Sequence, residues 1–312
     1  MVKSKADEDI KIASLFIILP VLFLIIGYIF FQYELSKDQI FFLQITIILS
    51  LFFLASGFFI KKEYLANKLK ILGWMIFAFY WSTQPSSLYF SEDGDLINAV
   101  LCGVGVFTLS YVAYHEWLSI KRKEKIGCLN WIAGAAFIAG VIYFGLERIP
   151  ILYMWMRETV AGHSAWFLQL VTGEEVYYHG VNIIYKEAYL VLIFACTAVQ
   201  AMVIFVGMIL PLPKVDIKRK IFGLIITVIP VYILNFMRMA MIAFLVGNEI
   251  TDFATAHNYL AKFGALIVLI VLLLIIVKII PEIMDEIFCI TDLHKRNGPL
   301  ELRFKKYIWR KK

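Results

Sequence analysis

Three side chains that can perform acyl transfer lie in the second half of the chain. Cys196 is in the apolar run FACTAVQAMVIFVG, Arg238 is in YILNFMRMAMIAF, and His257 precedes the last long apolar run. A thiolate is a nucleophile that a nearby cation stabilises, an imidazole can carry a proton to a leaving amine, and an arginine can stabilise an oxyanion. The three predict a catalytic site with Cys196 as nucleophile, Arg238 as transition-state stabiliser and His257 as acid and base.

Polar residues close to these three are predicted to support them. Thr197 and Gln200 add hydrogen-bonding groups beside the cysteine, and Asn235 precedes Arg238 by three residues and therefore shares a helix face with it. We assign Asn235, Thr197 and Gln200 to substrate binding or to support of the reacting groups. Because a charged side chain deep in a bilayer is costly, Arg238 is a functional candidate by its position alone.

Each reacting group also has a simpler explanation. A buried cysteine most often packs as a small hydrophobic residue. An intramembrane arginine can bind the carbonyls of an interrupted helix, such as the one that Pro230 is expected to kink. A lone loop histidine is commonly a surface residue, and His163 and His179 compete with His257 for the acid–base role. The sequence leaves these alternatives open.

The elements that must position these residues are membrane helices. Of the 312 residues 61% are hydrophobic and 17% are charged, whereas soluble domains average about half apolar and a quarter charged. Eight segments have the roughly 20 mostly apolar residues that a spanning helix needs. The segments are 12–31, 40–60, 71–90, 96–117, 129–147, 188–210, 220–246 and 262–280. We predict an all-α fold, a polytopic membrane helix bundle of about eight transmembrane helices.

Lysine and arginine predict the orientation of the bundle. They are concentrated at the amino end, in alternate connections and in the carboxyl tail, and positive charge of this kind marks the cytoplasmic side. The basic connections are 61–70, 118–128 and 211–220. Both termini are therefore predicted to be cytoplasmic. We predict one transmembrane catalytic domain over 1–281, with core helices in 188–280, and a basic cytoplasmic tail over 282–312. The net charge of +6 lies in short blocks between apolar runs, which argues against nucleic-acid binding.

The longest predicted outer segment is 148–187. It contains apolar residues that can form one face of an interfacial helix. They are Trp155, Val160, Trp166, Phe167 and Leu170. The segment is either a lid or substrate-entry element, or a loop anchored by its tryptophans.

The four cysteines do not predict a cofactor. Their spacing matches neither a metal site nor a disulfide framework. We therefore predict no metal and no organic cofactor, and a chemistry carried by side chains alone.

The motifs around the candidate residues resemble the exosortase/archaeosortase family. ACTAVQAM is followed about 40 residues later by LNFMR, and then by a histidine before the last helix. GLERIP at 145–150 and IVKIIPEIMDEI after the last helix are most similar to the archaeosortase A branch. The resemblance covers most of the chain and is best from about 130 to 288. Its most specific part is Cys-Thr-x-x-Gln with Asn-x-x-Arg at this spacing.

The resemblance implies a membrane cysteine transpeptidase or protease, with a carboxy-terminal sorting signal as substrate. Such a signal has a short motif, which contains Pro-Gly-Phe in the archaeosortase A branch, then a hydrophobic helix and a basic tail. The new carboxyl end is joined to a membrane lipid, so that S-layer and other surface proteins become lipid-anchored. The implied partners are these surface proteins and a lipid acceptor. The implied location is the cell membrane, with the site toward the extracellular face.

The family's functional positions transfer to single residues of this chain. Its nucleophile matches Cys196 and its first arginine matches Arg238. Its third position, which is histidine in some branches and arginine in others, matches His257. Ala198 stands where many members have glycine.

Three other functions are compatible with the same residues. A transporter or lipid flippase could bind an anionic substrate through Arg238, and would not need Cys196. A structural or assembly protein would need neither residue. A hydrolase would cleave the same signal without attaching a lipid.

Overall fold

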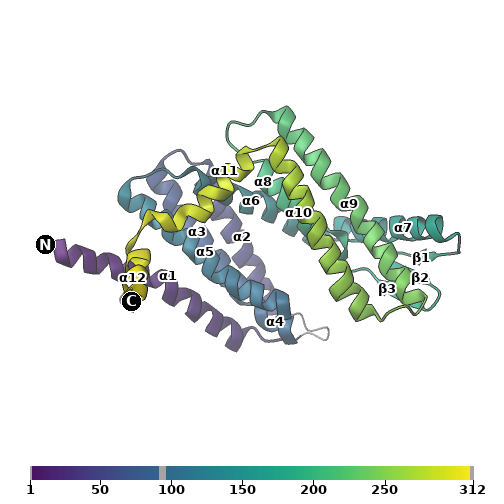
Figure 1. Ribbon diagram of the computed structural model, residues 1–312. Helices are drawn as coiled ribbons and strands as arrows, with labels where there is room; N and C mark the ends of the chain where they lie inside the picture. The colour runs from purple at the N-terminus through teal and green to yellow at the C-terminus, as the bar shows by residue number, and fades with distance from the viewer. Residues whose placement is uncertain (1, 91–95, 310–312) are drawn as a thin grey trace. The chain divides into compact units, whose positions relative to one another are not determined.

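The chain divides into two compact units in the computed structural model, which describes residues 2–90 and 96–309. Unit 1 comprises Met1–Phe137 and Glu286–Lys312, and unit 2 comprises Ile138–Asp285 (Figure 1). Cys196, Arg238 and His257 all lie in unit 2. Most of the predicted tail 282–312 belongs to unit 1, and its last three residues lie outside the described part of the chain.

Helices dominate both units and confirm the all-α polytopic membrane class. Within the described residues, six helices are long and apolar enough to cross a bilayer. They are Glu8–Phe30, Lys37–Phe59, Leu96–Arg122, Gly127–Arg148, Ile217–Gly247 and Thr255–Ile279. These six match six of the eight predicted segments. The segments 71–90 and 188–210 are not among these helices, and the predicted number of about eight is not confirmed for the residues that the structure describes.

Unit 1 is built on α2 (Lys37–Phe59), α3 (Glu63–Ser82) and α5 (Leu96–Arg122), with α1 (Val2–Phe30) against α3 and α5. Its core contains Leu54, Trp74, Ala113 and the first turn of α6 (Gly127–Arg148). Gly57 brings α2 close to α3, because a Cβ there would lie 2.8 Å from the Ala66 carbonyl oxygen. Small residues permit such close helix packing within membranes.

The predicted helix over 71–90 is wrong in its position. Helix α3 starts eight residues earlier, at Glu63, and ends at Ser82, while α4 (Gln84–Phe90) is a separate short helix. The break has a local cause, because Pro85 has no backbone N–H for a helical bond to the Trp81 carbonyl and is tolerated only in the first turn of a helix, here that of α4.

The carboxyl tail folds onto unit 1. It comprises α11 (Glu282–Thr291), the 3₁₀ turn η3 (Asp292–Arg296) and α12 (Pro299–Trp309). A disulfide joins Cys289 to Cys128 with a Cα–Cα distance of 6.0 Å. The cysteine spacing, which matches no disulfide framework, did not predict this bond. The partners are 161 residues apart, so their spacing in the sequence carries no signal.

Hydrogen bonds from α5 hold α12 in place. Tyr111 Oη donates to Glu301 Oε1 at 2.9 Å and Tyr114 Oη to Glu301 Oε2 at 2.8 Å. His115 Nε2 lies 3.3 Å from Glu301 Oε1. Burial raises the pKa of Glu301, but the hydrogen bonds from His115, from the backbone and from the two tyrosines outweigh it and lower this pKa to about 2.

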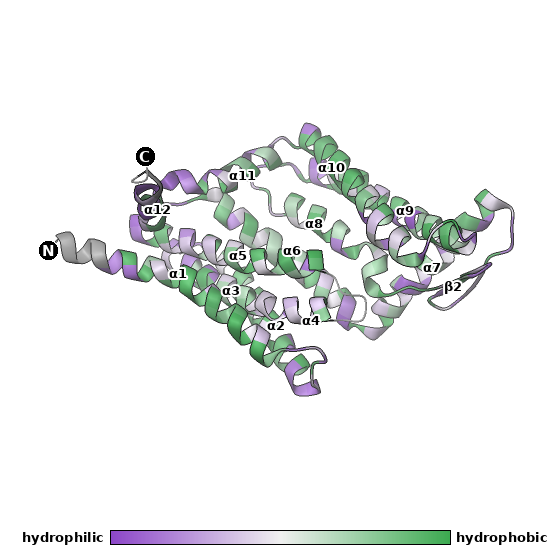
Figure 2. Ribbon diagram, turned by 60° about the horizontal axis from the view of Figure 1, so that its bottom comes forward, coloured by the Kyte–Doolittle hydropathy of each residue, from purple (hydrophilic) through white to green (hydrophobic). Residues whose placement is uncertain are grey.

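Unit 2 contains the candidate site and a small antiparallel sheet. After α7 (Pro150–Thr172) come β1 (Tyr177–His179), β2 (Asn182–Tyr185) and β3 (Ala188–Val191), in the order β1-β2-β3. The chain continues through η1 (Phe194–Thr197), α8 (Val199–Ile209), α9 (Ile217–Gly247), η2 (Thr255–Ala261) and α10 (Lys262–Ile279). Helix α10 is hydrophobic along most of its length (Figure 2).

The sheet packs on the end of α9. A Cβ at Gly247 would lie 2.5 Å from the Tyr185 carbonyl oxygen, so only glycine permits this approach. Lys186 Nζ donates to Asn248 Oδ1 at 2.7 Å and pairs with Glu174 at 2.8 Å. These contacts fix the hairpin that leads into the cysteine segment.

The apolar residues predicted to face the membrane interface lie on α7. The side chains of Trp155, Trp166 and Leu170 are 58–64% exposed on the protein surface, whereas Val160 is buried together with Leu168. The large apolar residues are therefore not part of the core of unit 2. Whether the segment is a lid or a loop anchored by its tryptophans stays a prediction.

Candidate functional site

Cys196 lies where the predicted helix over 188–210 is interrupted. The segment is a strand, a 3₁₀ turn and an 11-residue helix. The Cys196 amide donates to the Ile193 carbonyl at 2.9 Å, and the Cys196 carbonyl accepts a bond from Asn235 Nδ2 at 2.8 Å. The Asn235 amide thus satisfies the carbonyl that an unbroken helix would use. Irregular backbone at membrane depth is tolerated only where it is buried in protein or lines a cavity.

Ala198 makes this break sharp. Its φ of 58° places it in the left-handed region, immediately before α8. Glycine adopts this conformation without strain, whereas a residue with a Cβ pays about 1–2 kcal/mol. The glycine that the resembled family often has at this position therefore fits a backbone requirement.

Aromatic side chains pack against η1, the 3₁₀ turn that contains Cys196. Phe194 stacks on Tyr153, with ring centroids 5.5 Å apart, and meets Tyr143 edge-on at 5.5 Å. Arg157 lies over the Tyr153 ring, and its Nε donates to the Leu192 carbonyl at 2.6 Å. Packing of this kind locks a reacting group on otherwise irregular backbone.

Arg238 lies in α9 one turn beyond Asn235, whose side-chain amide binds the Cys196 carbonyl. Its Nε is buried and has no hydrogen-bond partner among the described residues, and its Nη2 lies 3.9 Å from Met239 Sδ. No carboxylate within the described ranges forms an ion pair with it. Cys196 interacts electrostatically with the guanidinium. The side chain thus lies in the region of the cysteine with much of its donor capacity unused.

A cavity of about 510 Å³ lies beside these residues. Ala195 and Ala198, on either side of the cysteine in the chain, contribute to its lining. Its polar members are Gln200, Asn235 and Arg238, and apolar side chains of α8, α9 and α10 form the rest. A mostly apolar cavity with a few convergent polar groups is typical of a binding site.

Gln200 and Thr197 have different roles in the structure. Gln200 lines the cavity, and its Nε2 donates to Tyr143 Oη at 3.1 Å, which in turn lies 3.4 Å from Glu147 Oε1. The Thr197 side chain is fully buried and donates to the Phe194 carbonyl at 2.6 Å. Gln200 can therefore contact a ligand, whereas Thr197 supports the turn.

His257 lies on the helix that closes the site. It is in the π-helical turn η2, with its ring stacked on Phe253 at 5.2 Å. The neighbouring Ala256 and Ala261 belong to the same buried cluster as Cys196. Ala261 also lines the cavity. The fold thus brings the His257 segment to the cysteine region.

His163, which lies in α7, contacts α9 through residues that the sequence analysis did not single out. Its Nδ1 lies 2.6 Å from Tyr232 Oη, and its ring packs on Phe236. Tyr232 lies on α9 one turn before Asn235, so the contact joins His163 of α7 to the helix that carries Asn235 and Arg238. His179, in contrast, is exposed in β1. Neither the tyrosine nor its pairing with α7 has a motif that could have revealed it.

Comparison with known proteins gives one informative similarity. The chain is 24% identical over 211 residues to archaeosortase A of Haloferax volcanii. It is similar to the archaeosortases. The match covers 61% of this chain and 66% of that protein, slightly less than two thirds of its length. No protein-family model and no solved structure matches. The similarity supports the archaeosortase/exosortase family at most and does not distinguish a branch.

Proposed function

We propose that this protein is a membrane cysteine transpeptidase of the archaeosortase kind. It cleaves a carboxy-terminal Pro-Gly-Phe-type sorting signal of surface proteins at the outer face of the cell membrane, and transfers the new carboxyl end to a membrane lipid. The observation that carries this proposal is one apolar cavity lined by Arg238, by Asn235, which binds the Cys196 carbonyl, and by the residues that flank Cys196. The distant similarity to archaeosortase A supports it.

The chemistry proceeds in two displacements. The Cys196 thiolate attacks the scissile carbonyl, the S–C bond forms, and Arg238 stabilises the oxyanion. The tetrahedral intermediate collapses, the C–N bond breaks, and His257 delivers a proton to the leaving amine. A lipid nucleophile then loses its proton to His257 and attacks the thioester, which returns the cysteine as thiolate. Asn235 holds the backbone of the nucleophile throughout.

The cavity suits the substrate's hydrophobic helix. Its walls on α8, α9 and α10 are apolar, with small residues such as Gly264 and Ala265 on α10. A helix in the bilayer can pack closely against small residues. The scissile bond would then lie where the signal helix meets the polar group formed by Gln200, Asn235 and Arg238.

The test is complementation of cells lacking the native enzyme with Cys196→Ala and Cys196→Ser. The measured quantities are the mobility and lipid labelling of one surface protein with a carboxy-terminal signal helix. Cys102→Ala is the matched control, because Cys102 is the other cysteine outside the disulfide and is equally buried at 7% exposure. We expect unprocessed precursor with both Cys196 variants at normal membrane levels of enzyme, and normal processing with Cys102→Ala.

A transporter or lipid flippase is the alternative that the same cavity favours. An arginine without a carboxylate partner among the described residues can bind an anionic substrate instead of an oxyanion. Continued processing with Cys196→Ala, together with loss of function in Arg238→Ala, would support that alternative and reject the cysteine mechanism. Cleaved protein without lipid would identify a hydrolase.

A further inference from the structure

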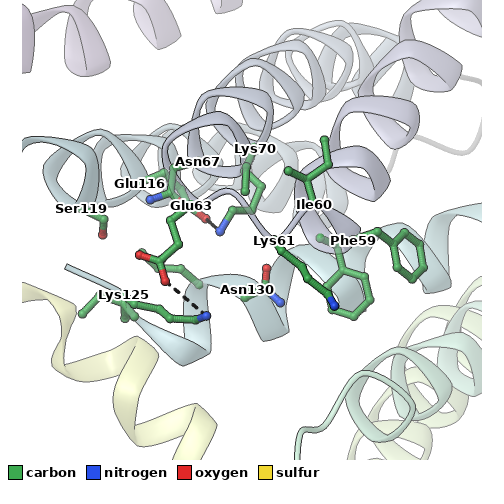
Figure 3. A pocket seen from close by; sticks show the side chains of 14 residues that line it. Phe59, Ile60, Lys61, Glu63, Asn67, Lys70, Glu116, Ser119, Lys125 and Asn130 are labelled. Atoms are coloured by element: carbon green, nitrogen blue, oxygen red, sulfur yellow. Dashed lines mark ion pairs between the residues drawn. The ribbon is translucent and has the colours of Figure 1, made fainter. Parts of the chain in front are cut away.

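Unit 1 contains a second cavity. It is polar, and none of the candidate catalytic residues lines it. Its volume is about 180 Å³, and it lies where α2 ends, α3 and α6 begin and α5 approaches its last turn. Three lysines and two glutamates line it, with Asn67, Asn130 and Ser119 (Figure 3). Because the apolar spans α2 and α6 have an end here, the cavity lies at the level where lipid headgroups meet water.

The inner part of the cavity is a buried ion pair. Lys70 Nζ lies 2.9 Å from Glu116 Oε1, and the two side chains are 4% and 1% exposed. Lys70 is thus the partner of Oε1, whereas Oε2 is buried and has no partner among the described residues. A buried carboxylate oxygen without a donor is costly. Glu116 Oε2 therefore calls for an N–H or O–H donor that enters the cavity.

The outer part of the cavity favours an anion. Lys125 and Glu63 form an exposed pair at 3.3 Å, whereas Lys61 has no ion-pair partner among the described residues. Helix α3 begins at Glu63, and its N-cap residue Lys62 makes no side-chain capping bond. The uncapped amides and the helix dipole attract negative charge at this end.

We propose that this cavity binds a phosphoryl group linked by a short chain to a primary ammonium, the chemistry of a phosphoethanolamine headgroup. The ammonium donates to Glu116 at the inner end, and the phosphoryl group lies between Lys61 and the amino end of α3. The linker contacts the apolar wall around Ile60 and Leu129. The group can come from a membrane lipid or from a soluble phosphoamine.

The experiment uses the full chain in phosphatidylcholine nanodiscs. Soluble O-phosphoethanolamine, phosphocholine and inorganic phosphate are titrated, and the thermal unfolding midpoint is followed because a ligand of the folded state raises it. In a second arm, phosphatidylethanolamine replaces part of the phosphatidylcholine. We expect stabilisation by phosphoethanolamine or by phosphatidylethanolamine, and at least about tenfold weaker binding of phosphocholine, whose quaternary ammonium has no N–H to donate. A response to the lipid alone assigns the source to the membrane, and a response to both assigns it to either.

Two sets of variants keep the proposal falsifiable even if the ion pair is needed for folding. Lys61→Ala changes an exposed lining residue and should weaken binding about tenfold with an unchanged midpoint in the absence of ligand. Lys62→Ala, the exposed neighbour outside the lining, is the matched control. Glu116→Gln with Lys70→Met removes both charges and should abolish the preference for a primary ammonium. Equal binding of phosphate and phosphoethanolamine, no stabilisation by any probe, or equal effects of Lys61→Ala and Lys62→Ala would overturn the proposal.

Discussion

In unit 1 the Lys70 ammonium lies 2.9 Å from the Glu116 carboxylate, whereas in unit 2 Arg238 has no carboxylate partner within the described residues. Both basic side chains are drawn into apolar helices, so both carry a desolvation cost. In the first case a protein group offsets that cost. In the second case the arginine interacts electrostatically with the candidate nucleophile, Cys196. The difference supports the proposal that Lys70 contributes to the stability of the resting protein, whereas Arg238 is positioned for charge that develops during a reaction.

The largest expected effect is on stability, from breaking the pair in unit 1. Lys70→Met leaves Glu116 buried without its partner, and should lower the free energy of unfolding by about 3–5 kcal/mol. The double variant Lys70→Met/Glu116→Leu should recover most of this loss. The measurement is unfolding in detergent with Lys62→Met as control. A single variant as stable as the control would show that the pair is not a structural element.

The next effect concerns unit 2, where we expect a loss of activity without a loss of stability. Arg238→Leu removes a charge without leaving a carboxylate unpaired, so the unfolding midpoint should be unchanged or higher. Precursor processing should fall about 10²–10³-fold, the usual cost of losing one oxyanion donor. The rate of processing and the midpoint are measured on the same preparations. A destabilised but active variant would contradict the difference in role between Lys70 and Arg238.

A smaller effect is expected from Asn235→Leu. The Cys196 carbonyl then loses the donor at 2.8 Å, and the free energy of unfolding should fall by about 1–3 kcal/mol. Processing should fall as well, because the nucleophile is no longer held. Thr197→Val is the control, since the Thr197 hydroxyl bonds only within its own turn, to Phe194. Similar processing in both variants would argue against a positioning role for Asn235.

The smallest effect near neutral pH concerns the tail. The pKa of Glu301 is lowered from 4.5 to about 2 in the folded protein, so this group stabilises the folded state above pH 4.5. The contribution is lost as the pH falls from 4.5 through 2. Hydrogen exchange of α12 should therefore accelerate over this range, and Glu301→Gln should remove the pH dependence. An α12 exchange rate that is insensitive to Glu301→Gln would contradict this role.

The parts of the fold that the sequence predicts are those that composition determines. Six spans follow from runs of apolar residues, and Arg238 and Asn235 fall on one α9 face because a helix repeats regularly. The interruption at Cys196 could not be predicted, because the segment 188–210 is apolar over most of its length and the break depends on Ala198 and on a bond from Asn235. Charge counting assigns Lys70 to the connection 61–70, but its partner Glu116 is 46 residues away and makes it part of the core. Long-range pairs of this kind, like Cys128 with Cys289, leave no local pattern.

The catalytic assignment of His257 remains a prediction. The fold is compatible with it, but His163 is a second imidazole that reaches the same part of unit 2. The His257 segment joins the cysteine cluster through Ala256 and Ala261. His163, on α7, also reaches α9, where its Nδ1 lies 2.6 Å from Tyr232 Oη. Separate His257→Gln and His163→Gln variants, compared in the processing assay, would identify which imidazole transfers the proton.

The most direct test of the central claim is mass spectrometry of the purified full chain during turnover of a signal-bearing substrate protein. We predict a hydroxylamine-sensitive acyl adduct on the peptide that contains Cys196, with the mass of the substrate minus its signal helix. The adduct should be absent in Cys196→Ala and unaffected by Cys102→Ala. Substrate cleavage by the wild-type protein without an adduct, with the new carboxyl end labelled directly from ¹⁸O-water and cleavage persisting in Cys196→Ala, would contradict the cysteine mechanism.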